Sequence, residues 1–227
     1  MRNWSMRDTR KTEAYFEGYI AYEQERIEHW CEKLADAGNA DKKLRVNANL
    51  LLNRMHLMIA SFSYGASRSE LQELYKKVCA TACETRALTY YNALVLASFS
   101  VMLNETAEIQ PLFKKFGNVF DDDKLLNGLR SYIQTGKAVW TGDYRFPTPY
   151  SGLDAVLAAP DKAQQEQHLM HYLEGWYAGC EDCVWYDTLY NENDVYYGYW
   201  SFESAAIADI LGLDPKHLAK CEYFPVL

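Results

Sequence analysis

The stretch VYYGYWSFESAAIADILGLD, residues 195–214, decides the fold of this chain. Its aromatic half runs into Ser201, whose hydroxyl can cap a helix by accepting a hydrogen bond from a backbone N–H of the first turn. Apolar side chains follow at helical spacing, and Gly212 suits the left-handed conformation at a helix end. Glu203 lies in the first turn, where the helix dipole favours a negative charge, and we interpret it as a carboxylate that accepts backbone or tyrosine hydrogen bonds. The stretch therefore predicts an apolar helix over 201–211.

Helical periodicity also runs through the first half of the chain. Ser67-Arg68-Ser69-Glu70 fits a capping box, in which the first serine and the glutamate satisfy each other's backbone N–H groups. The stretch 89–103 is apolar on nearly every face, which is typical of a helix at the centre of a helical protein. The expected helices begin after Asp8 or Thr9 and end at Gly38, span 41–64, run from the capping box to Glu84, and span 89–103.

The second half has weaker periodicity and more breaks. Asp121, Asp122 and Asp123 are ordinary N-terminal charge for the helix that follows them. The stretch 136–152 contains two prolines and three glycines and predicts an ordered aromatic loop. Further helices are expected over 153–158 and from Asp161 to about Tyr186, with a last turn beginning at Asp214-Pro215.

These patterns predict one fold class. They contain no convincing strand, so we expect an all-α multi-helix bundle. The Pro- and Gly-containing loop is the best candidate for a boundary. It would separate an N-terminal sub-domain, 1–135, from a C-terminal sub-domain, 153–227, with 136–152 as the connection and a core shared between them.

Charged residues are distributed unevenly along the chain. The formal net charge of the 227 residues is −8, which disfavours nucleic acid or an anionic membrane as a direct partner. Residues 118–227 carry 7 basic side chains against 17 acidic ones. Between Lys162 and Lys216 there is no lysine or arginine, yet ten acids occur, interleaved with Trp and Tyr. Such a segment is either a solvated acidic face or a surface that attracts a basic partner.

Cysteines and histidines offer a separate, weaker hypothesis. Cys180 and Cys183 have CxxC spacing, and His168 and His171 precede them. A zinc site needs about four ligands, and a continuous helix would hold His171 and Cys180 roughly 13 Å apart, too far for one metal ion. We therefore expect free thiols, no metal and no cofactor. The chain also lacks the GxSxG, Walker, GxGxxG and HExxH motifs, so the sequence favours a protein that is not an enzyme.

Both ends of the chain carry a family resemblance. The residues concerned are Arg7-Asp8-Thr9-x-Lys11-x-Glu13-x-Tyr15-Phe16 near the start, and Trp176-Tyr177, Trp185-Tyr186-Asp187 and Tyr197-Gly198-Tyr199-Trp200-Ser201-Phe202-Glu203 near the end. In these residues the chain resembles the PoNi-type immunity proteins, which neutralise PoNe-family DNase toxins. The resemblance implies an all-α protein that is encoded beside a secreted DNase toxin used in competition between bacteria. Its task would be binding, and residues 197–203 would form a structural motif.

A mechanism follows from combining the resemblance with the charge pattern. A DNase must be electropositive where it holds phosphates, so an acidic, aromatic face could dock there and exclude DNA. The residues expected to contact the toxin are Glu181, Asp182, Trp185, Asp187, Tyr190, Glu192 and Asp194. Trp185 and Tyr190 would be the anchors.

Several alternatives stay open at this point. The chain could be a helical cysteine- or zinc-binding protein or a small enzyme of unknown reaction, and stoichiometric zinc in purified protein would favour that interpretation. A homodimer is compatible with immunity. The first residues include no apolar signal region, and no apolar run approaches the ~20 residues that span a bilayer, so we expect a cytoplasmic protein without a membrane partner.

Overall fold

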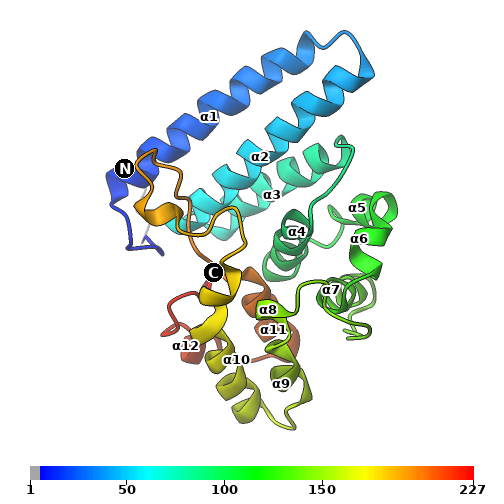
Figure 1. The fold of residues 1–227 in the computed structure, drawn as a ribbon, viewed down its shortest axis with the longest axis vertical. Coiled ribbons are helices and arrows are strands. Elements are labelled where there is room, and N and C mark those ends of the chain that lie inside the picture. The colour runs from blue at the N-terminus through cyan, green and yellow to red at the C-terminus, as the bar shows by residue number, and fades with distance from the viewer. Residues whose placement is uncertain (1–5) are drawn as a thin grey trace.

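The computed structural model describes residues 6–227, and every regular element in that range is a helix (Figure 1). The predicted all-α, multi-helix fold is therefore confirmed. None of these helices is both long and apolar enough to cross a membrane. The α-helices are α1 (Glu13–Ala35), α2 (Ala40–Tyr64), α3 (Arg68–Cys83), α4 (Tyr90–Leu103), α5 (Gln110–Lys115), α6 (Gly117–Asp121), α7 (Lys124–Thr135), α8 (Pro147–Tyr150), α9 (Leu153–Ala158), α10 (Lys162–Trp176), α11 (Phe202–Leu211) and α12 (Pro215–Leu218).

Helices α1 and α2 form a long antiparallel hairpin that extends away from the rest of the molecule (Figure 1). The residue that caps α1 is Thr12, whose hydroxyl accepts from the Tyr15 N–H, so the expected cap at Asp8 or Thr9 is wrong. Asp8 is buried, and its carboxylate accepts a hydrogen bond from the Tyr196 hydroxyl instead. Gly65 ends α2 with a φ of +104°, a conformation that glycine adopts without strain.

The remaining expected helix starts agree with the structure. Both hydrogen bonds of the capping box at Ser67 and Glu70 are present at the start of α3. Asp123 caps α7 by accepting from the Leu126 N–H at 2.8 Å. Local side-chain chemistry therefore determined where these helices begin.

Helix α4 occupies the centre of the fold, as its all-round apolar sequence predicts. It packs against α11, α7 and α3, and ten of its fourteen residues are buried. Phe99 of α4 lies with its ring centroid 4.5 Å from that of Phe202, and Phe202 lies 5.3 Å from Phe62 of α2. The buried apolar side chains form one continuous cluster with members on both sides of the 136–152 connection. The division into sub-domains stays a prediction.

Helix α10 ends at Trp176, ten residues before the expected end at Tyr186, so that prediction is wrong. The chain continues through a 3₁₀ turn at Ala178–Cys180 and a second one at Thr188–Tyr190. Two tertiary contacts explain the break. Gly179 lies so close to Pro149 that an added Cβ would be 2.7 Å from the Pro149 Cβ, and the Trp176 ring stacks on Trp185 with centroids 5.3 Å apart. A straight helix would break both contacts.

Candidate functional site

A buried carboxylate joins α10 to α11. One oxygen of Glu203, Oε1, accepts hydrogen bonds from the Tyr172 hydroxyl, the Trp176 indole N–H and the Ser201 hydroxyl, each at 2.7 Å. Glu203 is 3 % exposed, and burial raises its pKa above the ordinary value of 4.5. The interpretation of Glu203 as a hydrogen-bond acceptor at the helix start is confirmed. It lies within the core, so its role is to hold two helices together.

Ser201 occupies the N-cap position of α11 but makes no capping hydrogen bond. Its hydroxyl donates to Glu203 instead of accepting from the backbone, so the predicted cap interaction is wrong. The hydrogen bond to Glu203, at 2.7 Å, orients the hydroxyl, and its oxygen accepts from no N–H of the first turn. Gly212 ends α11 with a φ of +64°, as predicted.

The aromatic run before α11 crosses α2 at close range. Ser63 of α2 donates to the Tyr197 carbonyl at 2.8 Å and accepts from the Trp200 indole N–H at 2.8 Å. Gly198, between them, has a φ of +126°, and a Cβ added there would be 2.2 Å from the Ser63 Oγ. Residues 197–203, proposed from the sequence as a structural motif, lie buried throughout. Their contacts attach α2 to the C-terminal helices.

We expect Gly198→Ala to reduce the free energy of unfolding by about 3 kcal/mol, because the methyl group combines a strained φ with overlap at Ser63. Urea denaturation followed by circular dichroism measures this. The matched control is Gly175→Ala, since Gly175 is an exposed glycine of α10 with open space around it. That control is expected to leave the stability unchanged or to increase it. Equal stability of the two variants would contradict the prediction.

The segment 181–195, which we name the acidic loop, lies beside the beginning of α1 (orange in Figure 1). Its five expected contact acids are all exposed: Glu181, Asp182, Asp187, Glu192 and Asp194. Within residues 6–227, none of the five forms an ion pair with a lysine, arginine or histidine. The loop therefore presents carboxylates that no basic side chain of the described chain neutralises.

The two expected aromatic anchors lie in opposite environments. Tyr190 is 82 % exposed, as is suitable for contact with a partner, and Val184 of the same loop is 92 % exposed. Trp185 is 5 % exposed, so the role of a surface anchor does not fit it. Its ring packs against Trp176 and Tyr199 beneath the loop. Position in the sequence could not separate these two roles.

Tyrosine hydroxyls fix the backbone of the acidic loop. The Tyr199 hydroxyl accepts from the Leu189 N–H at 2.7 Å, and the Tyr177 hydroxyl accepts from the Asp187 N–H at 3.2 Å. Asp187 and Asp194 both adopt positive φ, at 58° and 48°. Because these contacts order the loop before any partner arrives, less conformational entropy is lost on binding.

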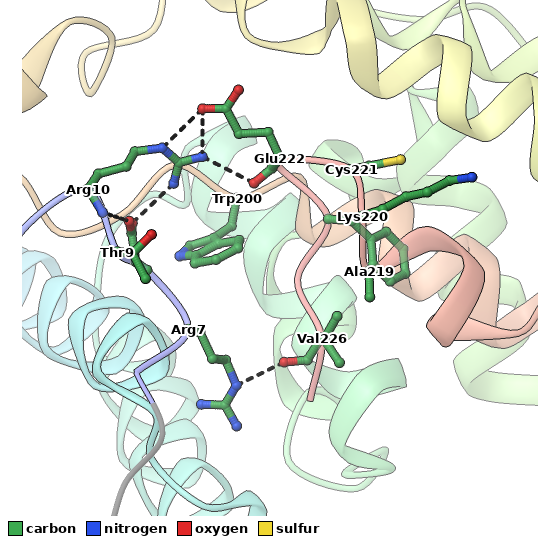
Figure 2. Close-up of a pocket in the computed structure, with 11 residues that line it drawn as sticks. Arg7, Thr9, Arg10, Trp200, Ala219, Lys220, Cys221, Glu222 and Val226 are labelled. Atoms are coloured by element: carbon green, nitrogen blue, oxygen red, sulfur yellow. Dashed lines mark hydrogen bonds and ion pairs between the residues drawn. The ribbon is translucent and has the colours of Figure 1, made fainter.

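A clamp that no sequence pattern indicated joins residues near the two ends of the described chain (Figure 2). Arg7 donates to the Val226 carbonyl at 2.8 Å and to the Phe62 carbonyl at 2.9 Å. Arg10 pairs with Asp8 and with Glu222, each at 3.2 Å. No local pattern predicts these contacts, because the partners Phe62, Glu222 and Val226 lie more than 50 positions away in sequence. A cavity of about 350 Å³ separates the two arginines, and we interpret it as part of this clamp.

The positions of the cysteine and histidine side chains do not support the hypothesis of a zinc site at Cys180 and Cys183. Cys180 is buried and Cys183 is half-buried, and the two belong to one turn in which the Cys183 N–H donates to the Cys180 carbonyl at 2.9 Å. The His171 side chain is exposed and lies near Glu174. In the part of the chain that the structure describes, no three His, Cys, Asp or Glu side chains are grouped so that they could hold a metal ion.

Comparisons with known proteins agree with the resemblance at the C-terminal end. Residues 121–226 match the sequence model of the family described as PoNe immunity proteins (PoNi), C-terminal. The fold is similar to the crystal structure of protein PA2201 from Pseudomonas aeruginosa, with a TM-score of 0.79 and 18 % identity over 98 % of this chain and 88 % of that chain. At this identity the likeness shows the fold alone. No curated protein matches the sequence. Residues 121–226 include the acidic loop and the Glu203 helix, so both lie in the part of the chain that is similar to the PoNe immunity proteins.

Proposed function

We propose that this protein binds a cognate DNase toxin and neutralises it by covering the toxin's DNA-binding or active site with the acidic loop. The observation that carries the proposal is the set of five exposed loop carboxylates without an ion-pair partner in residues 6–227, located inside the region that matches an immunity family. Binding, without catalysis and without a cofactor, would be sufficient for the task.

Electrostatics gives the loop its proposed selectivity. A nuclease surface that holds DNA phosphates carries an excess of lysine and arginine. Acids that are not compensated within their own chain raise the rate of encounter with such a surface and compete with DNA for it. The net charge of −8 acts in the same direction at longer range and disfavours direct contact with nucleic acid.

Exposed apolar and aromatic side chains would then hold the complex. Tyr190 and Val184 are among the most exposed large side chains of the described chain, and both lie in the acidic loop. Tyrosine is enriched among the residues that dominate interface energies. In this proposal the carboxylates determine the association rate, and these two side chains determine the dissociation rate.

The proposed setting is the bacterial cytoplasm, where the toxin would damage DNA of the producer and its kin. Co-expression tests the function directly: the DNase gene adjacent to this gene is expressed with and without the chain, and survival, DNA degradation and complex formation are scored. Rescue with a stoichiometric complex supports the proposal. Degradation of DNA at the same rate in both cultures would contradict it.

We expect Tyr190→Ala to increase the dissociation rate of the toxin complex by about 10-fold while leaving the melting temperature unchanged, because the ring is exposed in the free protein. Trp185→Ala is the informative comparison, since its indole is buried and the substitution removes core packing. Surface plasmon resonance and thermal melting separate the two effects. A Tyr190 variant with an unchanged dissociation rate would remove this residue from the interface.

A further inference from the structure

A groove separates α1 from the acidic loop and is not explained by the immunity motif. It has a volume of about 410 Å³ and is lined by Ala14, Tyr15, Gly18, Tyr19 and Tyr22 of α1 together with Asn193 and Asp194. Three tyrosines, Tyr15, Tyr19 and Tyr22, lie one turn apart along α1 and line the groove. Gly18 lies among them, and a Cβ built on it would have no neighbour within 4 Å.

The chain itself places cations on the ring faces at both ends of this row. The Lys11 ammonium lies 4.9 Å from the Tyr15 ring centroid, and the Arg26 guanidinium lies 5.5 Å from that of Tyr22. Electron-rich ring faces attract cations through their quadrupole. Cations of the chain therefore occupy both ends of the row, where Arg26 also donates to the Tyr22 hydroxyl, whereas a Cβ built on Gly18 at the centre would meet no neighbour within 4 Å.

A carboxylate stands at the edge of the open centre. Asp194 is exposed, lines the groove and forms no ion pair within residues 6–227. Its charge acts on the tyrosine row: burial, with a further contribution from Asp194, raises the pKa of Tyr15 to about 12. The groove therefore combines tyrosine rings with one carboxylate that has no ion-pair partner, and the Lys11 and Arg26 cations lie at its two ends.

We propose that this groove receives an arginine side chain of the bound toxin, with the aliphatic stem over Gly18 and the guanidinium between the tyrosine rings and Asp194. Charge complementarity and continuity with the acidic loop favour this occupant. Arginine suits the site better than lysine, because a planar guanidinium stacks on aromatic rings and is more weakly hydrated. The inference rests on the proposed function, and it extends the docking surface from the loop onto α1.

Gly18→Leu tests the groove by filling it. We expect the Kd for the purified DNase encoded beside this gene to rise by 10-fold or more, measured by isothermal titration calorimetry. Replacing a helical glycine does not itself destabilise the helix, so the melting temperature is expected to stay constant or rise. The matched control is Gly175→Leu, which changes another exposed helical glycine with open space around it and lies outside the groove. It is expected to leave the Kd unchanged.

Asp194→Asn, alone and combined with Gly18→Leu, is the second test of the groove. If arginine insertion couples Gly18 and Asp194, the double variant loses less affinity than the two single losses combined. A Gly18→Leu variant with the same Kd as Gly175→Leu would overturn the proposal that the groove binds an arginine, while leaving toxin binding by the acidic loop intact. Additive losses would also overturn it, because the two residues would then act on separate contacts. Failure of the unaltered protein to bind the DNase would overturn both the groove and the proposed function.

Discussion

Reversing all five carboxylates of the acidic loop to lysine should slow association with the toxin by at least about 100-fold at low ionic strength, because electrostatic steering accounts for differences of this size between association rates. The five changes remove five negative charges and add five positive ones, so the net charge moves from −8 to +2. None of these side chains forms an ion pair in the described residues, so the melting temperature should fall only through the strain of lysine at Asp187 and Asp194, which adopt positive φ. Stopped-flow measurements over a range of salt concentrations give the rates.

A control variant with the same change of net charge outside the acidic loop tests whether the slower association is specific to the loop. Five exposed acids outside the acidic loop serve: Glu28, Glu32, Asp36, Asp41 and Glu84. We expect their reversal to slow association far less. Equal slowing by both sets would mean that net charge alone attracts the toxin. An unchanged rate for the loop variant would mean that inhibition acts away from this surface.

Glu203→Ala should reduce the free energy of unfolding by about 3–9 kcal/mol, which is the second large effect. The substitution leaves the Tyr172 hydroxyl, the Trp176 indole N–H and the Ser201 hydroxyl without their common acceptor, and each unsatisfied buried donor costs about 1–3 kcal/mol. Because small domains are stable by only about 5–15 kcal/mol, the variant is expected to be largely unfolded near 37 °C. Chemical denaturation at 25 °C measures the change.

Glu203→Gln is the control and also reports the effect of pH. The amide keeps an oxygen that can accept from the three donors but cannot ionise. Burial raises the pKa of Glu203 in the folded protein, so the folded state binds its proton more tightly than the unfolded state. This contribution is complete below the ordinary value of 4.5 and is lost as the pH rises through the raised pKa. Denaturation at several pH values should show this loss in the unaltered protein and its absence in Glu203→Gln.

Much of the secondary structure followed from short-range chemistry. The capping box at Ser67, the cap at Asp123 and the glycine ends at Gly65 and Gly212 each depend on residues a few positions apart. The apolar character of α4 was sufficient to predict its central position. For the candidate site, the absence of basic residues between Lys162 and Lys216 identified the acidic segment without any structure.

Other features depended on contacts that no local pattern contains. Trp185 and Tyr190 occur in the same aromatic and acidic segment, yet Trp185 is buried and Tyr190 is exposed. The difference arises because the Trp185 ring packs against Trp176 and Tyr199. The groove beside Gly18 exists only because residues 193–194 fold back against a helix that begins 180 positions earlier.

The sequence by itself determined the helical class, most helix ends, the family resemblance at the C-terminal end and the sign of the exposed charge. Only the tertiary structure decided where α10 ends and that the Ser201 hydroxyl donates to Glu203. It also decided that Arg7 and Arg10 bind residues near the other end of the chain. The physical reason is the range of the interactions. Caps and periodicity act within a few residues, whereas close backbone approach, ring stacking and hydrogen bonds between distant segments depend on residues that only the folded chain brings together.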